Sequence, residues 1–142
     1  MPYVARATRL LQVPARVAFD RLADHDSWPR WMPASFRPVG RTVGRLTEGA
    51  SFRVTILGRL PAACRVQTVR NAEELTWCGG RRGVLWAEHR FLFEPRGAGA
   101  VEVQSVETWS GPLAALLKPA ILPGAVRVGR EQLEALAKAV AS

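Results

Sequence analysis

Two stretches, VLWAEHRFLFE at positions 84–94 and AVEVQSVETW at positions 100–109, flank the short segment PRGAG at positions 95–99. Apolar and polar residues alternate with period two on both sides of this glycine-rich segment, a pattern typical of a β-hairpin. A three-residue loop at positions 97–99 sets the pairing of the two strands. In that register His89 lies directly opposite Glu107.

This register divides the hairpin into two distinct faces. One face carries Leu85, Ala87, His89, Phe91, Phe93, Val101, Val103, Ser105, Glu107 and Trp109. The other carries Glu88, Arg90, Glu94, Glu102, Gln104 and Thr108. A shift of one residue would mix the two sets, so the pattern supports the register. We interpret the first face, with its single imidazole–carboxylate pair, as the wall of a core or of a ligand pocket.

The same periodicities assign the rest of the chain. Strands are expected at positions 3–12, 36–45, 52–56, 64–68 and 75–78, and short helices at 15–23 and 27–32. After Trp109 the period becomes helical, and Pro119 and Pro123 are expected to kink or interrupt this last helix. Its apolar side is predicted to resume with Val126, Arg130, Leu133, Ala137 and Val140. Consecutive strands with helices kept apart in sequence indicate the α+β class with an antiparallel sheet.

Length and composition limit the class of protein. The 142 residues, 48% of them apolar, predict a single folded domain over positions 1–142. No apolar run is long enough to span a bilayer, and Arg6 stands where a signal peptide needs an apolar core. Cys64 and Cys78 are predicted to lie on opposite faces of the sheet, so we expect no disulfide between them. We therefore expect a cytoplasmic protein without integral membrane association.

The chain is basic, with 20 Lys and Arg against 12 Asp and Glu and a net charge of +8. Such a balance can indicate a nucleic acid or an anionic membrane surface as partner. The arginines are spread along the whole sequence, however, and only Arg81 and Arg82 are adjacent. We interpret them as a solvated surface and expect no nucleic-acid partner.

Four stretches resemble the START-like, or SRPBCC, superfamily of polyketide cyclases, lipid-transfer domains and birch-pollen-allergen proteins. They are LQVPARVAF (11–19), LADHDSWPRWMP (22–33), EHRFLFEP (88–95) and ETWSGPL (107–113). The resemblance implies a helix-grip fold. In this fold a curved antiparallel sheet of about six to seven strands wraps a long C-terminal helix, two short helices follow the first strand, and a cavity lies between sheet and helix.

The candidate site residues are those expected to face this cavity. They are His89, Glu107, Arg9, Trp28, Trp31, Phe52, Trp77, Phe91, Trp109 and Leu116. His89 and Glu107 are candidates for orienting a ligand or for acid–base catalysis; alternatively, they are a buried pair that only satisfies its own hydrogen bonds. The aromatic residues are equally consistent with a plain core. Trp86, on the outer face, is a candidate homodimer contact or part of an apolar patch under a loop.

Known catalytic and metal-binding motifs are missing from the sequence. There is no HExxH, no GxSxG, no CxxC and no phosphate-binding glycine loop, so we expect no metal and no cofactor. The leading hypothesis is a binding protein for a small hydrophobic molecule such as a lipid or polyketide, which enters near positions 119–123. The alternative is an enzyme of the polyketide cyclase or dehydratase type that uses His89. A binder of RNA or of membrane surfaces is the least favoured reading.

Overall fold

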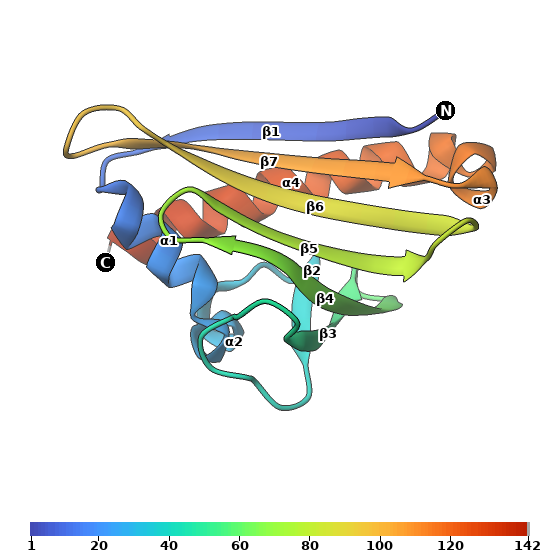
Figure 1. Ribbon diagram of the computed structural model, residues 1–142, viewed down its shortest axis with the longest axis horizontal. Helices are drawn as coiled ribbons and strands as arrows, with labels where there is room; N and C mark the ends of the chain where they lie inside the picture. The colour runs from blue at the N-terminus through green and yellow to red at the C-terminus, as the bar shows by residue number, and fades with distance from the viewer. Residues whose placement is uncertain (142) are drawn as a thin grey trace.

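The computed structural model describes residues 1–141 (Figure 1). The strands are β1 (Tyr3–Leu11), β2 (Phe36–Val39), β3 (Ser51–Ile56), β4 (Leu60–Arg70), β5 (Glu74–Arg81), β6 (Leu85–Pro95) and β7 (Val101–Ser110). The helices are α1 (Ala15–Ala23), the 3-10 turn η1 (His25–Ser27), α2 (Trp28–Trp31), α3 (Pro112–Leu116) and α4 (Lys118–Ala141). This order confirms the predicted α+β class.

The strands form one antiparallel sheet of seven strands in the order β1-β7-β6-β5-β4-β3-β2. The predicted hairpin is β6 and β7, and its register is confirmed because His89 faces Glu107. The strand expected at 36–45 is shorter than predicted and ends at Val39, since Gly40 and Gly44 adopt positive φ angles that start a loop. Cys64 and Cys78 are both free. On the paired strands β4 and β5, Cys64 lies opposite Gly79 and Cys78 lies opposite Arg65.

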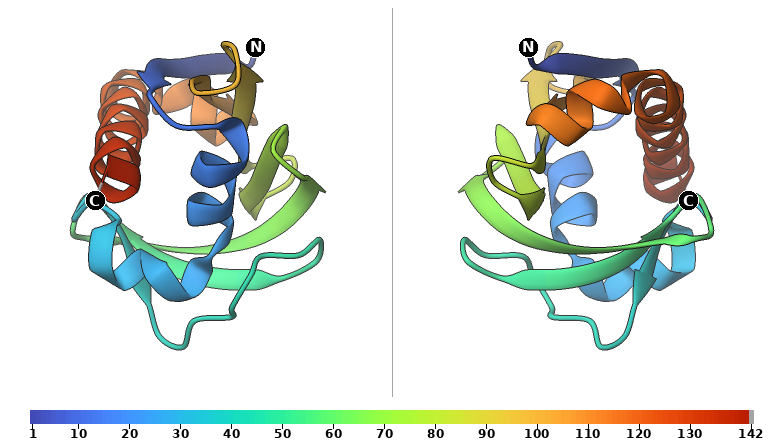
Figure 2. Two further views of the ribbon diagram at one scale, coloured as in Figure 1. Left: turned by 90° about the vertical axis from the view of Figure 1, so that its left-hand side faces the viewer. Right: turned by 90° about the vertical axis from the view of Figure 1, so that its right-hand side faces the viewer.

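The sheet curls so that its concave face encloses the interior of the molecule, and α4 closes that face over β1 and β7 (Figure 2). This arrangement is the predicted helix-grip fold. The inward side of β6 and β7 is largely apolar and buried from Phe91 and Phe93 to Val101 and Val103. Burial of this surface is the main source of stability expected for such a sheet.

The C-terminal helix differs from its prediction in two respects. The break falls at Leu117, between α3 and α4, and α4 then runs on through Pro123. Pro119 lies in the first turn of α4, where its missing N–H removes no helical hydrogen bond. The buried residues of α4 are Ala125, Val128, Gly129, Gln132, Leu133, Leu136 and Ala139. The predicted stripe was therefore wrong in part: Leu133 is buried and Ala137 and Val140 are partly buried against the core, whereas Arg130 is exposed.

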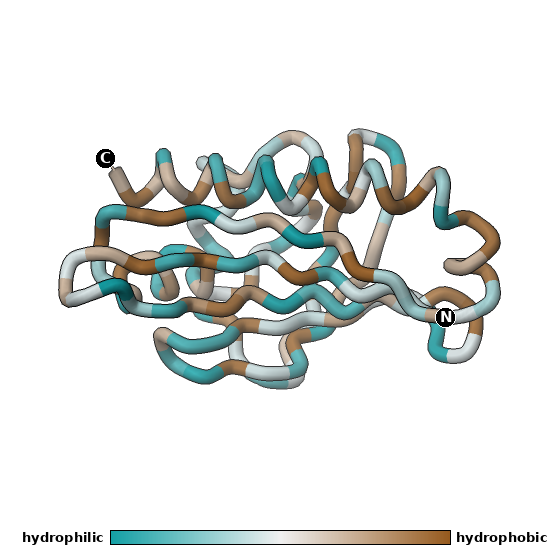
Figure 3. The backbone as a smooth tube through the Cα atoms, turned by 90° about the horizontal axis from the view of Figure 1, so that it is seen from above, coloured by the Kyte–Doolittle hydropathy of each residue, from teal (hydrophilic) through white to brown (hydrophobic). Residues whose placement is uncertain are grey.

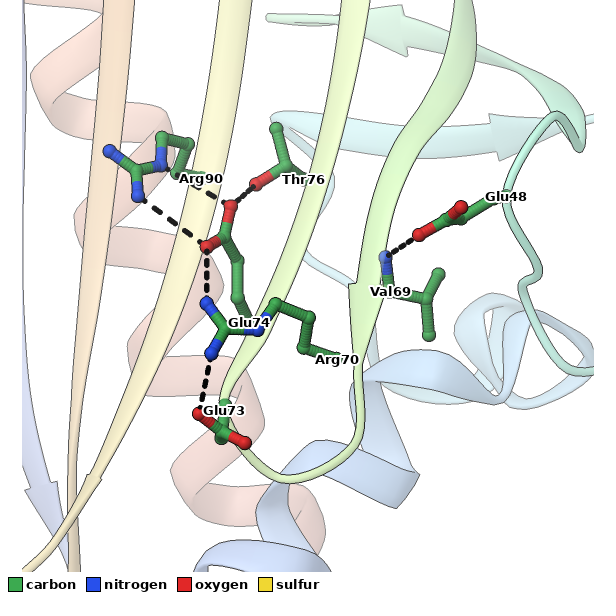
Figure 4. Close-up of polar contacts among 7 residues, drawn as sticks. All are labelled: Glu48, Val69, Arg70, Glu73, Glu74, Thr76 and Arg90. Carbon is green, nitrogen blue, oxygen red and sulfur yellow. Dashed lines mark hydrogen bonds and ion pairs between the residues drawn. The ribbon is translucent and has the colours of Figure 1, made fainter.

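A network of charged residues covers part of the outer face of the sheet (Figure 4). Glu74 is buried there and accepts a hydrogen bond of 2.6 Å from the hydroxyl of Thr76. Arg90 and Arg70 also approach its carboxylate. The hydroxyl and the two guanidinium groups lower the pKa of Glu74 although burial opposes them. The network therefore stabilises the pairing of β5 with β6 and with the end of β4.

His25 attaches the loop between β2 and β3 to the corner formed by α1 and α2. Its Nδ1 accepts a hydrogen bond of 3.0 Å from the backbone N–H of Val43, and the backbone N–H of His25 donates to the carbonyl of Gly44. The ring is buried against Trp28 and Phe52. Because Nδ1 is an acceptor, the imidazole is neutral with its proton on Nε2.

We expect this contact to make the protein less stable in mild acid. Burial lowers the pKa of His25, and the charges of Asp26 and Asp24 only partly oppose this effect. The unfolded chain, with a histidine pKa of about 6.5, takes up the proton first, so the free energy of unfolding falls as the pH drops below that value. Urea denaturation across this range measures the slope, which His25 can raise by at most about 1.4 kcal/mol per pH unit. The variant His25→Gln should lack the contribution of His25 to this slope. An unchanged slope in the variant would contradict the neutral, buried state of His25.

Candidate functional site

His89 and Glu107 lie side by side on the concave faces of β6 and β7. Nδ1 of His89 is 3.1 Å from Oε2 of Glu107, which is ion-pair distance, although the two groups are not aligned as a hydrogen bond. On the other side of the ring, Nε2 is 2.7 Å from Oγ of Ser105. A proton on Nδ1, toward the carboxylate, leaves Nε2 to accept from the Ser105 hydroxyl.

Glu107 is the most accessible member of this group. Its side chain is 14% exposed, against 3% for His89. Its second oxygen, Oε1, accepts a hydrogen bond of 2.8 Å from the indole Nε1 of Trp109. Ser105, in contrast, lies beneath α4, because a Cβ placed on Gly129 would be 2.9 Å from the Ser105 hydroxyl. A molecule approaching from the interior would therefore meet the carboxylate and the indole before the imidazole or the serine.

The charge of Glu107 acts on two further groups. Burial, followed by the charges of Glu107 and the neighbouring thiol of Cys78, raises the pKa of Cys64 to about 12. Burial and the charge of Glu107 also raise the pKa of Tyr3, whose hydroxyl donates a 2.9 Å hydrogen bond to the carbonyl of Ala114. Both groups therefore stay protonated at neutral pH. Glu107 is thus the local source of negative charge on this part of the concave face.

Four of the aromatic residues expected at the site instead fill the middle of the concave face. Trp28, Phe52, Trp77 and Phe91 are at most 4% exposed. The Trp77 ring lies at the centre, with ring centroids 5.4 Å from Trp28, 5.4 Å from Phe52 and 5.2 Å from Phe91. Because these rings pack against one another, this half of the interior is a solid core.

The concave face becomes less covered toward the end that carries α3. Leu75, Phe91 and Ser105 form one row across β5, β6 and β7, and all three are buried. The row Gly79, Ala87 and Trp109, nearer to α3, is only half-buried. Leu85, further along β6, is also half-buried. Glu107 lies between the solid core and this more accessible apolar surface, which we call the open row (Leu85, Ala87, Gly79 and Trp109).

Three further predicted site residues lie elsewhere. Arg9 is exposed and pairs with Val103, whereas Ala5 is the residue opposite Glu107. Leu116 is 75% exposed at the end of α3 and does not face the interior; the buried residue of this helix is Ala114. Trp31 lies in a separate groove and donates from Nε1 to the Ser27 hydroxyl.

Two hollows lie away from His89 and Glu107. One, of about 720 Å³, is bounded by Arg53, Arg65, Cys78 and Trp86 of the outer face and also by Phe52, Cys64 and Gly79. The other, of about 690 Å³, is the groove between α1–α2 and α4 that contains Trp31. Trp86, the candidate dimer contact, is half-buried, with the Arg82 guanidinium 4.4 Å from its ring centroid. Neither hollow includes His89 or Glu107.

The sequence analysis missed two buried polar residues. Ser105 was predicted to face inward, but its hydrogen bond to His89 was not predicted. Its signal was its position two residues before Glu107, on the same face as His89. Gln132 is buried on α4, and neither its amide nitrogen nor its amide oxygen has a hydrogen-bond partner among residues 1–141. Its signal was a glutamine at helical spacing from Val128, Gly129 and Leu136, which the incorrect stripe concealed.

The sequence and the fold can be compared with those of known proteins. Residues 4–141 match the family model described as polyketide cyclase / dehydrase and lipid transport. The chain belongs to this family. No curated protein matches the chain.

Solved structures show the same fold. Norcoclaurine synthase from Thalictrum flavum, in a complex with dopamine and hydroxybenzaldehyde, superposes with a TM-score of 0.74 at 12% identity over 99% of this chain and 87% of that one. A hypothetical protein from Helicobacter pylori gives a TM-score of 0.71 at 18% identity, over 97% and 88% of the two chains. A protein from Chromobacterium violaceum gives 0.67 at 17% identity, over 98% and 97%. At these identities the likeness concerns the fold alone.

Two other features bear on the kind of site that this family member carries. Within residues 1–141, no three side chains of His, Cys, Asp or Glu gather closely enough to hold a metal ion. No helix in the same range has the length and apolar content required to cross a bilayer.

Proposed function

We propose that this family member binds a small apolar molecule on the concave face, against the open row and beside Glu107. The observation that carries the proposal is the gradient of burial on this face, from a solid aromatic core to half-buried Ala87 and Trp109. An apolar surface with a few polar groups converging on it is the usual form of a small-molecule site. The family to which the chain belongs supports the same class of ligand.

The chemistry at Glu107 suggests which polar group the ligand carries. One carboxylate oxygen accepts a hydrogen bond from the Trp109 indole, which orients the carboxylate, and the other lies 3.1 Å from Nδ1 of His89. An ionised carboxylate can only accept further hydrogen bonds. A ligand hydroxyl or amine would donate to it, whereas a ligand carboxylate at the same place would be repelled. The expected ligand is therefore a largely apolar molecule with a neutral or cationic donor group.

Binding would be driven by the apolar part of the ligand and oriented by its donor. Each Å² of apolar surface removed from water contributes about 25 cal/mol. A hydrogen bond to a charged group adds about 1.5–3 kcal/mol when it is well formed. Specificity among ligands of similar length would therefore come from Glu107 and not from the open row.

Displacement of the neutral dye Nile red tests this proposal. We expect dodecanol to displace the dye at least about tenfold more effectively than dodecanoate does, because only the alcohol can donate to Glu107. The variant Glu107→Gln keeps the shape of the side chain and should remove most of this difference. Native mass spectrometry of protein isolated from its cells should in addition show a retained apolar molecule.

A pair of matched variants locates the site. Ala87→Phe fills the open row and should abolish dye binding, whereas Ala63→Phe, on an exposed position of β4, should leave it intact. Circular dichroism shows whether both variants are folded. Dye binding that survives Ala87→Phe, or that is absent from the wild type, would overturn the proposal.

A second candidate function is an enzyme of the cyclase or dehydratase type. The contacts of His89 with Glu107 and Ser105 favour it, because they form a chain along which a proton can be held or passed. In this reading Glu107 would take the proton from a ligand, and His89 would act from behind it. His89→Ala should then abolish turnover of a polyketide-like substrate and leave dye binding unchanged, whereas equal turnover would exclude the role.

A further inference from the structure

The end of the molecule that carries α3 presents an unusual group of exposed aliphatic side chains. Leu116 is 75% exposed, Leu113 and Leu117 are each 40% exposed, and Val84, in the turn between β5 and β6, is 38% exposed. Figure 1 places α3 and this turn at the same end, and Figure 3 shows apolar segments of the chain there. We call these four residues the α3 tip.

The α3 tip is attached firmly to the sheet. The backbone N–H of Leu113 donates a 3.0 Å hydrogen bond to the carbonyl of Val84, which joins the short helix to the β5–β6 turn. The hydroxyl of Tyr3 in β1 donates to the carbonyl of Ala114, in the middle of α3. The leucines of α3 are thus held in place by hydrogen bonds of the α3 backbone to the sheet.

Three cations lie close to the α3 tip in sequence, and the first acidic residue after the β5–β6 turn is Glu88. Arg81 ends β5, Arg82 lies in the turn before Val84, and Lys118 follows Leu117 at the start of α4. Segments 81–87 and 111–122 contain no Asp and no Glu. None of these three cations forms an ion pair with another residue in the described chain. Arg82 and Lys118 instead lie over aromatic rings, 4.4 Å from the Trp86 ring centroid and 5.5 Å from the Tyr3 ring centroid, so their charges are not neutralised by a carboxylate. Exposed aliphatic side chains next to such cations are complementary to an apolar layer beneath an anionic surface.

We propose that the α3 tip docks this protein reversibly on the surface of an anionic lipid bilayer. The leucines would enter the boundary between head groups and acyl chains, and Arg81, Arg82 and Lys118 would lie at the level of the lipid phosphates. The inference rests in part on the proposed function. Since the open row lies toward the same end of the sheet, docking would bring the ligand site next to the membrane from which an apolar ligand could be taken.

Charge argues against a second copy of the chain as the occupant. A symmetric dimer through the α3 tip would place the same surface of both subunits face to face. The cations of one subunit would then approach those of the other, with no acidic residue from either segment to compensate them. An anionic bilayer offers the opposite charge along with the apolar layer.

Vesicle co-sedimentation tests the proposal with two compositions: phosphatidylcholine alone, and a mixture of one part phosphatidylglycerol to three parts phosphatidylcholine. We expect binding to the mixture that is about tenfold or more stronger than to phosphatidylcholine alone and that weakens with salt. Leu116→Ser should lower this binding by about tenfold. Its matched control is Leu10→Ser, an exposed leucine at the other end of β1, which should change binding by less than about twofold.

A second pair of variants separates local from general electrostatics. Arg81→Gln combined with Lys118→Gln should weaken vesicle binding by about fivefold for each cation lost. Arg16→Gln combined with Lys138→Gln removes the same charge at other exposed positions and should have little effect. Equal loss in the two double variants, or no binding of the wild type to the mixed vesicles, would overturn the proposal. A dimer in sedimentation velocity that Leu116→Ser disrupts would assign the tip to self-association instead.

Nile red binding, measured on the same proteins, keeps this inference distinct from the proposed function. All α3-tip variants should bind the dye as the wild type does, because none of them alters the open row. Vesicle binding without dye binding would support membrane docking and refute the ligand site. Dye binding without vesicle binding would support the ligand site and refute membrane docking.

Discussion

Replacing Gly111 with alanine is expected to lower the free energy of unfolding by about 3 kcal/mol or more. Gly111 links β7 to α3 with φ of 102° and ψ of 157°, a region of backbone space that is essentially restricted to glycine. A Cβ added there would also lie 2.3 Å from the carbonyl oxygen of Val84, which cannot move without disturbing its bond to Leu113. Denaturation with urea, followed by circular dichroism, measures the loss.

Gly83→Ala is the matched control for this variant. Gly83 also has a positive φ, of 78°, but a Cβ added there meets nothing within 4 Å. Gly83→Ala should therefore lower the free energy of unfolding by the conformational strain alone, about 1–2 kcal/mol. Equal losses in the two variants would contradict the close approach of α3 to the β5–β6 turn, on which the geometry of the α3 tip depends.

Replacing Trp28 with alanine should be about as damaging, with an expected loss of about 3–5 kcal/mol. The indole is fully buried among Phe36, Phe52 and Trp77, and its Nε1 donates a 2.8 Å hydrogen bond to the carbonyl of Leu22. The variant would leave a cavity in the core and an unpaired buried carbonyl. The same urea denaturation measures this effect.

Two other substitutions serve as controls for Trp28→Ala. Trp28→Phe restores most of the ring but not the hydrogen bond, and should cost about 1–3 kcal/mol. Trp86→Ala removes an indole of equal size from the outer face, where it is half-buried beside Arg82, and should cost about 1 kcal/mol. If Trp28 were part of a ligand cavity and not of the core, its alanine variant would resemble that of Trp86 in stability.

The pairing of His89 with Glu107 shows what local patterning can predict. Side chains of a strand alternate between two faces, so a hairpin with one apolar face has only one register that buries this face. That constraint is contained within 26 contiguous residues, from Val84 to Trp109. The same reasoning gave the α+β class and the order of the elements along the chain, which the structure confirms.

The buried face of α4 shows where local patterning fails. Alanine, valine and glycine occur on several sides of this helix, so more than one stripe satisfies a helical period. The deciding contact is made by Gly129, whose missing side chain lets the helix approach Ser105 and Ala7. No property of the helix sequence specifies the strand residues that it will meet.

The sequence by itself determined where most strands lie, which side chains of the β6–β7 hairpin face inward, and that an imidazole faces a carboxylate, because each of these depends on neighbours along the chain or across a single turn. The tertiary structure decided the rest. The curl of the sheet determines that Trp28, Phe52, Trp77 and Phe91 meet and fill one half of the interior, while Trp109 and Ala87 remain half-buried. The bond between Leu113 and Val84 places the leucines of α3 beside Arg81 and Arg82. Such contacts join segments far apart in sequence, and their geometry is set by how the elements pack and not by the period of any one of them.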